Sequence, residues 1–168
     1  LLEVIFLDES GHGKAISDLP IGSYYVQEIS TNSAYLLDDT KYPVVFEYAG
    51  QDTATVHISA NDGNAIENEI IYGSVSGKKS DEDGNALGGA TLGIFKTGTA
   101  EFTKETAIAT TVSAEDGSFS FEKVPYGTWI VREIESPKGF VLSEEEIAVT
   151  VGKVDEVVEI ELVNYRIR

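Results

Sequence analysis

The sequence predicts an all-β chain of tandem β-sandwiches, and two observations lead to this prediction. Most stretches alternate apolar and polar residues with a period of two, are rich in Val, Ile, Thr, Tyr and Phe, and are bounded by Gly, Asp or Asn. One pattern also occurs twice, as LPIGSYYVQEI at 19–29 and as VPYGTWIVREI at 124–134. In each copy the Pro and Gly suit a type I turn, and a strand is expected to follow it.

The spacing of this repeat indicates the domain organisation. Glu28 and Glu133 lie 105 positions apart in a chain of 168 residues, which is long enough for two small domains. We expect a first domain at 1–72, whose N-terminal strands are missing, and a complete second domain at 73–168. The junction has no Pro-rich or Gly/Ser-rich spacer, so one domain is expected to run almost directly into the next.

Short strands bounded by turn residues are expected along the whole chain. In the first domain they are predicted at 1–7, 44–48 and 53–60, besides the strand that follows the LPIG turn. Seven strands are predicted in the second domain, a number typical of a sandwich, at 71–79, 91–95, 108–112, 118–122, 128–134, 146–151 and 157–164. The loops DEDG at 81–84 and AEDG at 114–117 supply Asp and Gly for tight turns. Neither loop has the carboxylate spacing of a known calcium loop, and we expect no metal and no cofactor.

Composition narrows the classes of partner. The 29 acidic and 12 basic residues give a net charge of −17, which argues against nucleic acid and anionic lipid. No apolar run approaches the roughly 20 residues of a membrane span, so no membrane insertion of this segment is expected. Cysteine is absent, which leaves no disulfide or thiolate metal site to stabilise small domains. Position 1 is not Met, and we interpret the segment as a piece of a longer protein.

Strand alternation places a carboxyl group in an apolar stripe in both copies. Trp129, Val131 and Glu133 share one face of their strand, and Glu28 holds the corresponding place in the first copy. A buried carboxyl is costly unless a neighbouring group requires it. Both glutamates are therefore candidate functional residues.

Two further polar residues close apolar stripes in the second domain. Lys79 shares the inward face of the opening strand with Val75, whereas Lys78 points the other way. Asn164 ends the apolar face of the final strand. Lys79, Glu133 and Asn164 can therefore meet in one buried pocket.

Two interpretations of this triplet are open. One is a hydrogen-bonded polar cluster in the core. The other is an intramolecular isopeptide bond, because burial favours a neutral lysine whose amine can attack an Asn carboxamide. A protonated Glu would polarise the carbonyl and pass protons to the departing ammonia. This reaction occurs once, so we expect no enzyme activity beyond single-turnover autocatalysis.

Three runs of the second domain closely resemble a known family. They are KKSDEDGNALGGATLGIF at 78–95, DGSFSFEKVPYGTWIVREIESPKGFVL at 116–142 and IELVN at 160–164. They resemble the B-type repeat of Gram-positive collagen adhesins, also called the SpaA-type pilin domain. The resemblance implies a prealbumin-like β-sandwich with an immunoglobulin-like appearance.

The resemblance also implies roles for the three polar residues. In the family, a lysine two places before the Asp of a D-x-D-G turn bonds to the Asn of the final strand. In this sequence the lysine is Lys79 and the asparagine is Asn164. The catalytic Glu of the V-x-E motif is Glu133. These are the residues that the alternation places on the inward face.

The first copy resembles the back part of the same domain. Glu28 matches the catalytic position and Asn68 matches the acceptor position. TNSA at 31–34 replaces the usual Pro-x-Gly turn, the lysine strand is missing, and neither Lys14 nor Lys41 lies where a substitute is needed. We expect upstream residues or another molecule to donate the strands that complete this domain.

The expected function is structural. A bond between the first and last strands suits a stalk under tension, in a pilin-like module of an extracellular, cell-wall-attached Gram-positive adhesin. Neighbouring repeats of the same parent protein are the expected partners.

The alternative is a sandwich that binds a carbohydrate or another host ligand, since exposed aromatic rings stack on sugars. Trp129 is expected in the core, and the candidates for exposure are Tyr25, Tyr42, Tyr72 and Tyr126. A hydrolase is not expected, because neither His12 nor His57 has a nucleophile at a suitable spacing.

Overall fold

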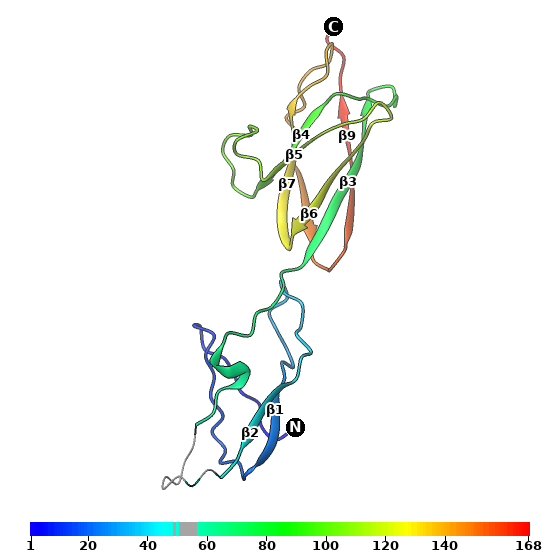
Figure 1. The fold of residues 1–168 in the computed structure, drawn as a ribbon. Helices are drawn as coiled ribbons and strands as arrows, with labels where there is room; N and C mark the ends of the chain where they lie inside the picture. The colour runs from blue at the N-terminus through cyan, green and yellow to red at the C-terminus, as the bar shows by residue number, and fades with distance from the viewer. Residues whose placement is uncertain (49, 51–56) are drawn as a thin grey trace. The chain divides into compact units, whose positions relative to one another are not determined.

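A computed structural model describes residues 1–48, 50 and 57–168 of the chain. The predicted all-β fold is confirmed, with one short 3₁₀ turn, η1 (Ala60–Gly63), among the strands. The strands are β1 (Gly22–Val26), β2 (Tyr42–Phe46), β3 (Tyr72–Asp81), β4 (Thr91–Lys96), β5 (Ala109–Val112), β6 (Ser118–Pro125), β7 (Gly127–Glu135), β8 (Ile147–Val151) and β9 (Val157–Asn164) (Figure 1). The chain divides into two compact units, residues 1–29 with 38–67 and residues 30–37 with 68–168.

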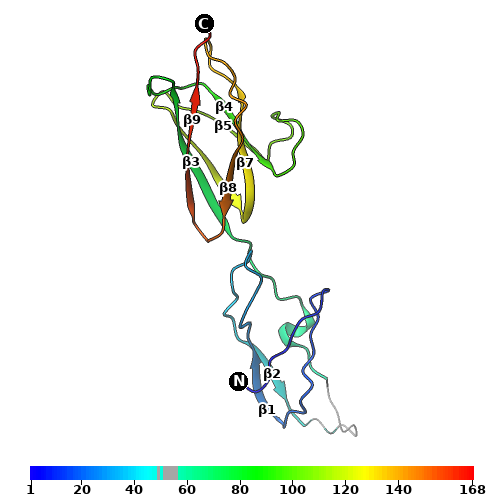
Figure 2. The same cartoon turned by 180° about the vertical axis from the view of Figure 1, so that it is seen from behind.

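The second unit is a two-layer sandwich. One sheet has the strand order β6-β3-β9 and the other has the order β5-β4-β7-β8. Every strand predicted after residue 70 is present, and β9 has the predicted bounds. β3 and β9 pair in parallel, although most of the domain separates them in sequence, and Figure 2 shows them side by side.

The core lies between the two sheets. The three-stranded sheet contributes Val75, Phe119, Phe121 and Leu162, and the four-stranded sheet contributes Leu92, Ile94, Val131, Val149 and Val151. Burial of each of these side chains contributes roughly 1.5–3 kcal/mol. Position 77 requires glycine, because any side chain there would collide with the Phe119 ring and the Ile160 carbonyl.

The first unit repeats one strand pair of the second. β1 and β2 are antiparallel with the register Gly22↔Phe46, which corresponds to Gly127↔Val151 in the β7–β8 pair at the same offset of 105 positions. The strand predicted at 44–48 is present but begins at Tyr42.

Other predictions for the first unit have different outcomes. The strand predicted at 1–7 is wrong, because these residues pair with no strand in the described part of the chain and the Phe6 side chain is exposed. A strand leaves its backbone groups without partners unless another strand lies beside it. Residues 53–56 of the strand predicted at 53–60 lie outside the described residues, residues 57–59 form no strand, and Ala60 begins η1.

Candidate functional site

Lys79 is held by backbone hydrogen bonds near the end of β3. Its N–H donates to the carbonyl of Gly117 at 2.7 Å, and its own carbonyl accepts from the N–H of Leu87 at 2.9 Å. In the parallel pair with β9 it lies opposite Leu162, which faces the core. The lysine side chain therefore points into the sandwich, and only 1% of the residue is exposed.

Asn164 is the last residue of β9 and points into the same end of the core. Its amide nitrogen Nδ2 donates to the Val141 carbonyl at 2.6 Å and to Glu133 Oε2 at 2.8 Å. The residue is 1% exposed. The carboxamide is therefore oriented by two acceptors on its nitrogen.

Glu133 reaches the same pocket from the opposite sheet. It follows Val131 on the inward face of β7 and is also 1% exposed. Its Oε2 accepts from the backbone N–H of Ser143 at 2.7 Å, and its Oε1 lies 3.8 Å from Lys79 Nζ. The structure thus brings together the three residues that the alternation selects.

Three buried atoms of this pocket have no hydrogen-bond partner among the described residues: Lys79 Nζ, Glu133 Oε1 and Asn164 Oδ1. Most buried polar side-chain atoms in folded proteins have such a partner, and leaving one unsatisfied costs about 1–3 kcal/mol. A finished hydrogen-bonded cluster would not leave one such atom on each of its members. Each member of the triplet therefore carries one buried polar atom that is not satisfied by a hydrogen bond.

Burial also affects the lysine. Desolvation lowers the pKa of Lys79, against the smaller opposing effect of the Glu133 charge. The neutral amine, which is the nucleophilic form, is thereby favoured. Such an arrangement can support aminolysis of the Asn164 carboxamide. The nitrogen that would leave, Asn164 Nδ2, is already hydrogen-bonded to Glu133.

The first copy repeats hydrogen bonds of the second at the same offset. Glu28 Oε2 accepts from the N–H of Asp38 at 2.8 Å, as Glu133 Oε2 accepts from Ser143. The Tyr24 hydroxyl donates to the Pro20 carbonyl at 2.8 Å, at the positions where the Trp129 indole donates to Pro125. The local surroundings of the two glutamates are therefore alike.

Asn68 also has the local contact of its counterpart. Its Nδ2 donates to the Leu36 carbonyl at 2.9 Å, and Leu36 occupies the position of Val141 in the repeat. Lys14 and Lys41 are both exposed, and Lys41 Nζ lies 4.8 Å from the centre of the Tyr25 ring. Neither lysine is buried in the way that Lys79 is.

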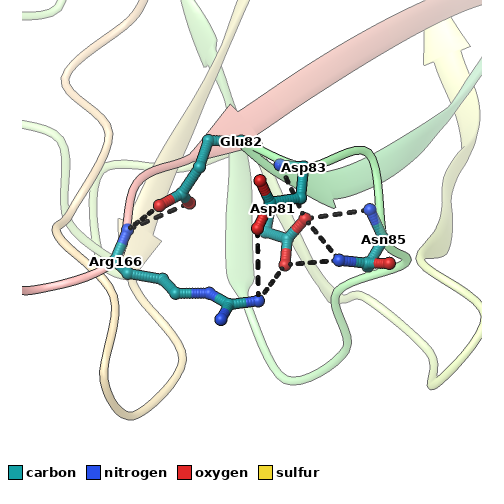
Figure 3. A network of polar contacts seen from close by, with 5 residues as sticks. All are labelled: Asp81, Glu82, Asp83, Asn85 and Arg166. Carbon is teal, nitrogen blue, oxygen red and sulfur yellow. Dashed lines mark hydrogen bonds and ion pairs between the residues drawn. The ribbon is translucent and has the colours of Figure 1, made fainter.

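Sequence reasoning missed the groups that orient the triplet. Two are backbone groups, the N–H of Ser143 and the carbonyl of Val141, and backbone groups carry no residue-type signal. The glutamate contact recurs ten positions downstream in both copies, at Asp38 and Ser143, but only the structure shows it. Sequence reasoning also missed the ion pair of Asp81 with Arg166, which lies at the end of β3 and β9 (Figure 3).

The aromatic residues agree with the expectation in part. Trp129 packs against the core as predicted, and Tyr25 and Tyr72 are exposed. Tyr42 and Tyr126 were expected to be exposed but are half-buried. The Tyr42 hydroxyl donates to Asp38 Oδ2, and the Tyr126 hydroxyl bonds to the hydroxyl of Ser33.

Neither a metal-binding cluster nor a membrane-spanning helix is found in the described part of the chain. No group of three or more His, Cys, Asp and Glu residues in residues 1–48, 50 and 57–168 is placed to hold a metal ion. No helix in the same residues has the length and apolar character to cross a membrane.

Comparisons with known proteins give a family and a fold. The family model SpaA, described as a prealbumin-like fold domain, matches residues 5–64 and 73–166. No curated protein matches the chain. Among solved structures, the Bacillus anthracis TIE protein is similar with a TM-score of 0.72 and 24% identity, over 97% of this chain and 28% of that chain. The chain therefore spans less than a third of that protein.

Two pilus proteins are also similar. BcpA, the major pilin subunit of Bacillus cereus, has a TM-score of 0.49 and 19% identity, over 63% of this chain and 35% of that chain. The pilus 2b backbone protein of group B streptococcus has a TM-score of 0.49 and 15% identity, over 96% of this chain and 77% of that chain. The two segments matched by the family model confirm the predicted tandem of prealbumin-like domains.

Proposed function

The chain belongs to the SpaA prealbumin-like fold domain family, and from this premise we propose that it is a structural module of a stalk or pilus on a Gram-positive cell surface. We further propose that an autocatalytic isopeptide bond between Lys79 and Asn164 stabilises the second domain. The observation that supports this bond is the buried triplet in which Lys79, Glu133 and Asn164 each keep one atom without a hydrogen-bond partner among the described residues.

The reaction balances within these three side chains. Lys79 Nζ attacks the carboxamide carbon of Asn164, so that a bond from Nζ to this carbon forms and the bond from the carbon to Nδ2 breaks. Glu133 accepts a proton from the attacking amine and returns one to Nδ2, which leaves as ammonia. Its two oxygens suit this transfer, since Oε1 lies 3.8 Å from Lys79 Nζ and Oε2 lies 2.8 Å from Asn164 Nδ2.

The topology supports a role under tension. β3 and β9 are parallel, and the proposed bond lies near the C-terminal ends of both. A force applied before Tyr72 and after Asn164 would pass along β3 to Lys79 and cross directly to Asn164. Residues 80–163 would lie outside this path, so neighbouring modules could pull on the domain without unfolding it.

The intact mass of the denatured protein tests the proposal. We expect the wild-type chain to be lighter than its sequence requires by one ammonia. The variants Lys79→Ala, Glu133→Ala and Asn164→Ala should each have the full mass. Lys78→Ala is the matched control, because Lys78 is exposed beside Asp116, and it should keep the deficit. A wild-type chain of full mass would reduce the triplet to an ordinary buried cluster.

For the domain predicted at 1–72, the roles of Glu28 as a catalytic carboxyl and Asn68 as an acceptor stay a proposal. Their matching local hydrogen bonds support it. The described lysines before residue 68 are both exposed, so we propose that a donated strand supplies the lysine. A second ammonia lost from residues 1–168 alone would contradict this need for a donor.

A further inference from the structure

An ion-paired network joins the turn after β3 to the residues after β9 (Figure 3). The guanidinium Nη2 of Arg166 donates to Asp81 Oδ2 at 2.7 Å and lies 3.7 Å from Asp83 Oδ2. The backbone N–H of Arg166 lies 3.2 and 3.1 Å from the two carboxylate oxygens of Glu82. Arg166 is thus held through its side chain and its backbone.

Asp81 is a rigid partner in this network. The residue is 4% exposed, and its Oδ1 accepts from the backbone N–H groups of Asp83 and Asn85 at 3.0 and 2.9 Å. The Asn85 amide donates to both Asp81 oxygens at 3.1 Å. These bonds fix the carboxylate within its own turn, so Arg166 is fixed relative to β3.

On both strands, the network lies two residues beyond the proposed crosslink. Asp81 follows Lys79 by two residues and pairs with Asn164 in the β3–β9 ladder, and Arg166 follows Asn164 by two residues. No tight turn joins these parallel strands, so side chains must help to set their register. A slip of one residue would turn Asn164 to the opposite face and remove it from Lys79.

Arg166 is also tied to the segment that holds the leaving nitrogen. It forms a β-bridge with Phe140, and the neighbouring Tyr165 carbonyl accepts from the N–H of Val141 at 2.8 Å. The carbonyl of Val141 in turn accepts from Asn164 Nδ2. Holding Arg166 therefore constrains both Asn164 and one of its two acceptors.

We propose that Asp81 and Arg166 are positioning residues, which hold the end of β9 so that Asn164 meets Lys79 and Glu133. This inference rests on the proposed crosslink. Arg166 touches none of the reacting atoms in the described contacts, and it acts by fixing the strand that carries Asn164.

The rate of crosslinking tests this role. The full chain is made by cell-free synthesis, samples are quenched in denaturant at increasing times, and the loss of ammonia is followed by intact mass. We expect Arg166→Ala to crosslink about tenfold or more slowly than wild type, because small misplacements of reacting groups cost rate steeply. Arg166→Lys should recover part of the rate, since it restores a cation beside Asp81.

Two controls separate positioning from general stability. Arg168→Ala removes a neighbouring arginine and should react at the wild-type rate. Lys104→Ala breaks a solvent-exposed ion pair of 2.8 Å with Glu135. Melting temperatures of Arg166→Ala and Lys104→Ala, each measured with Glu133→Gln to block the reaction, show how far each change destabilises the fold.

Each outcome is decisive. If Arg166→Ala reacts at the wild-type rate, or no more slowly than an equally destabilised Lys104→Ala, the positioning role is wrong while the crosslink stands. If Arg166→Lys crosslinks as slowly as Arg166→Ala, the positive charge at position 166 does not have the proposed role. If the wild-type chain never loses ammonia, the crosslink fails and the positioning role fails with it.

Discussion

Asn164 Nδ2 lies 2.8 Å from Glu133 Oε2, and the two residues belong to opposite sheets of the sandwich. Lys79 comes from the same sheet as Asn164, on the neighbouring strand. The Glu133 carboxyl group on one sheet therefore lies near two nitrogen atoms on the other sheet, Asn164 Nδ2 and Lys79 Nζ. The proposed bond would join adjacent parallel strands, with its catalyst facing them across the core.

The crosslink should account for a large share of the stability of the second domain. A bond that closes a loop of nearly domain length contributes about 4–5 kcal/mol if it acts as a disulfide does. We expect Glu133→Gln, which keeps the shape of the side chain but cannot transfer the proton, to lower the free energy of unfolding by this amount. Guanidinium denaturation measures it, and equal stability of the two proteins would contradict the crosslink.

Without the bond, the polar triplet should destabilise the fold. Three buried atoms lack hydrogen-bond partners among the described residues, and well-packed apolar replacements of buried ionic groups often stabilise proteins by about 1–4 kcal/mol. We expect Lys79→Met with Glu133→Leu and Asn164→Leu to be more stable than Glu133→Gln alone. Chemical denaturation of both variants provides the comparison. A less stable triple variant would show that the triplet is well satisfied without reacting.

Acid should weaken the Asp81–Arg166 pair. The guanidinium of Arg166, followed by the amide of Asn85, holds the pKa of Asp81 well below its ordinary value. A lowered pKa in the folded state stabilises the protein above the unfolded-state value of about 3.9, and this contribution is lost as the pH falls toward the folded-state pKa. We expect Asp81→Asn to be less stable than its parent at neutral pH and to lose less stability on acidification.

Denaturation at several pH values, in proteins that carry Glu133→Gln, measures this effect. The control is Asp116→Asn. The Ser118 hydroxyl also lowers the pKa of Asp116, but the Asp116 side chain is 67% exposed. Its pH dependence should change less. Equal slopes for Asp81→Asn and its parent would exclude Asp81 as a source of acid sensitivity.

Under tension, most of the crosslinked domain should not be extended. When the chain is pulled from both ends, the wild-type second domain should release little length, because residues 80–163 are bypassed. Lys79→Ala should unfold at lower force and release the full domain length. Single-molecule pulling measures both quantities, with Lys78→Ala as the control. Full extension of the wild type would contradict the force path.

The first unit should be much less protected than the second. Its described ladder has only β1 and β2, and large apolar side chains such as Phe6 and Ile16 are exposed. Two-stranded pairs are marginally stable in water. We expect amides of β1 and β2 in residues 1–168 to exchange hydrogen far faster than those of β4 and β7. Comparable protection, measured by mass spectrometry on the monomer, would show that this unit needs no donated strand.

Much of the fold could be predicted because strand alternation is a local property. The period of two assigns each side chain to a face, and this was enough to select Lys79, Glu133 and Asn164 and to place all the strands of the second domain. The repeat likewise indicated two domains with matching glutamates. Local patterns failed at 1–7, where an apolar stretch has no neighbouring strand among the described residues.

The sequence by itself therefore determined the all-β class, the tandem of related domains and the inward face of each polar residue, because these depend on near neighbours along the chain. Only the tertiary structure decided that β3 lies parallel to β9, that Val141 and Ser143 direct backbone groups at the triplet, and that Arg166 meets Asp81. Such contacts join residues far apart in sequence. They depend on which strands become neighbours, and alternation along one strand carries no information about the strand beside it.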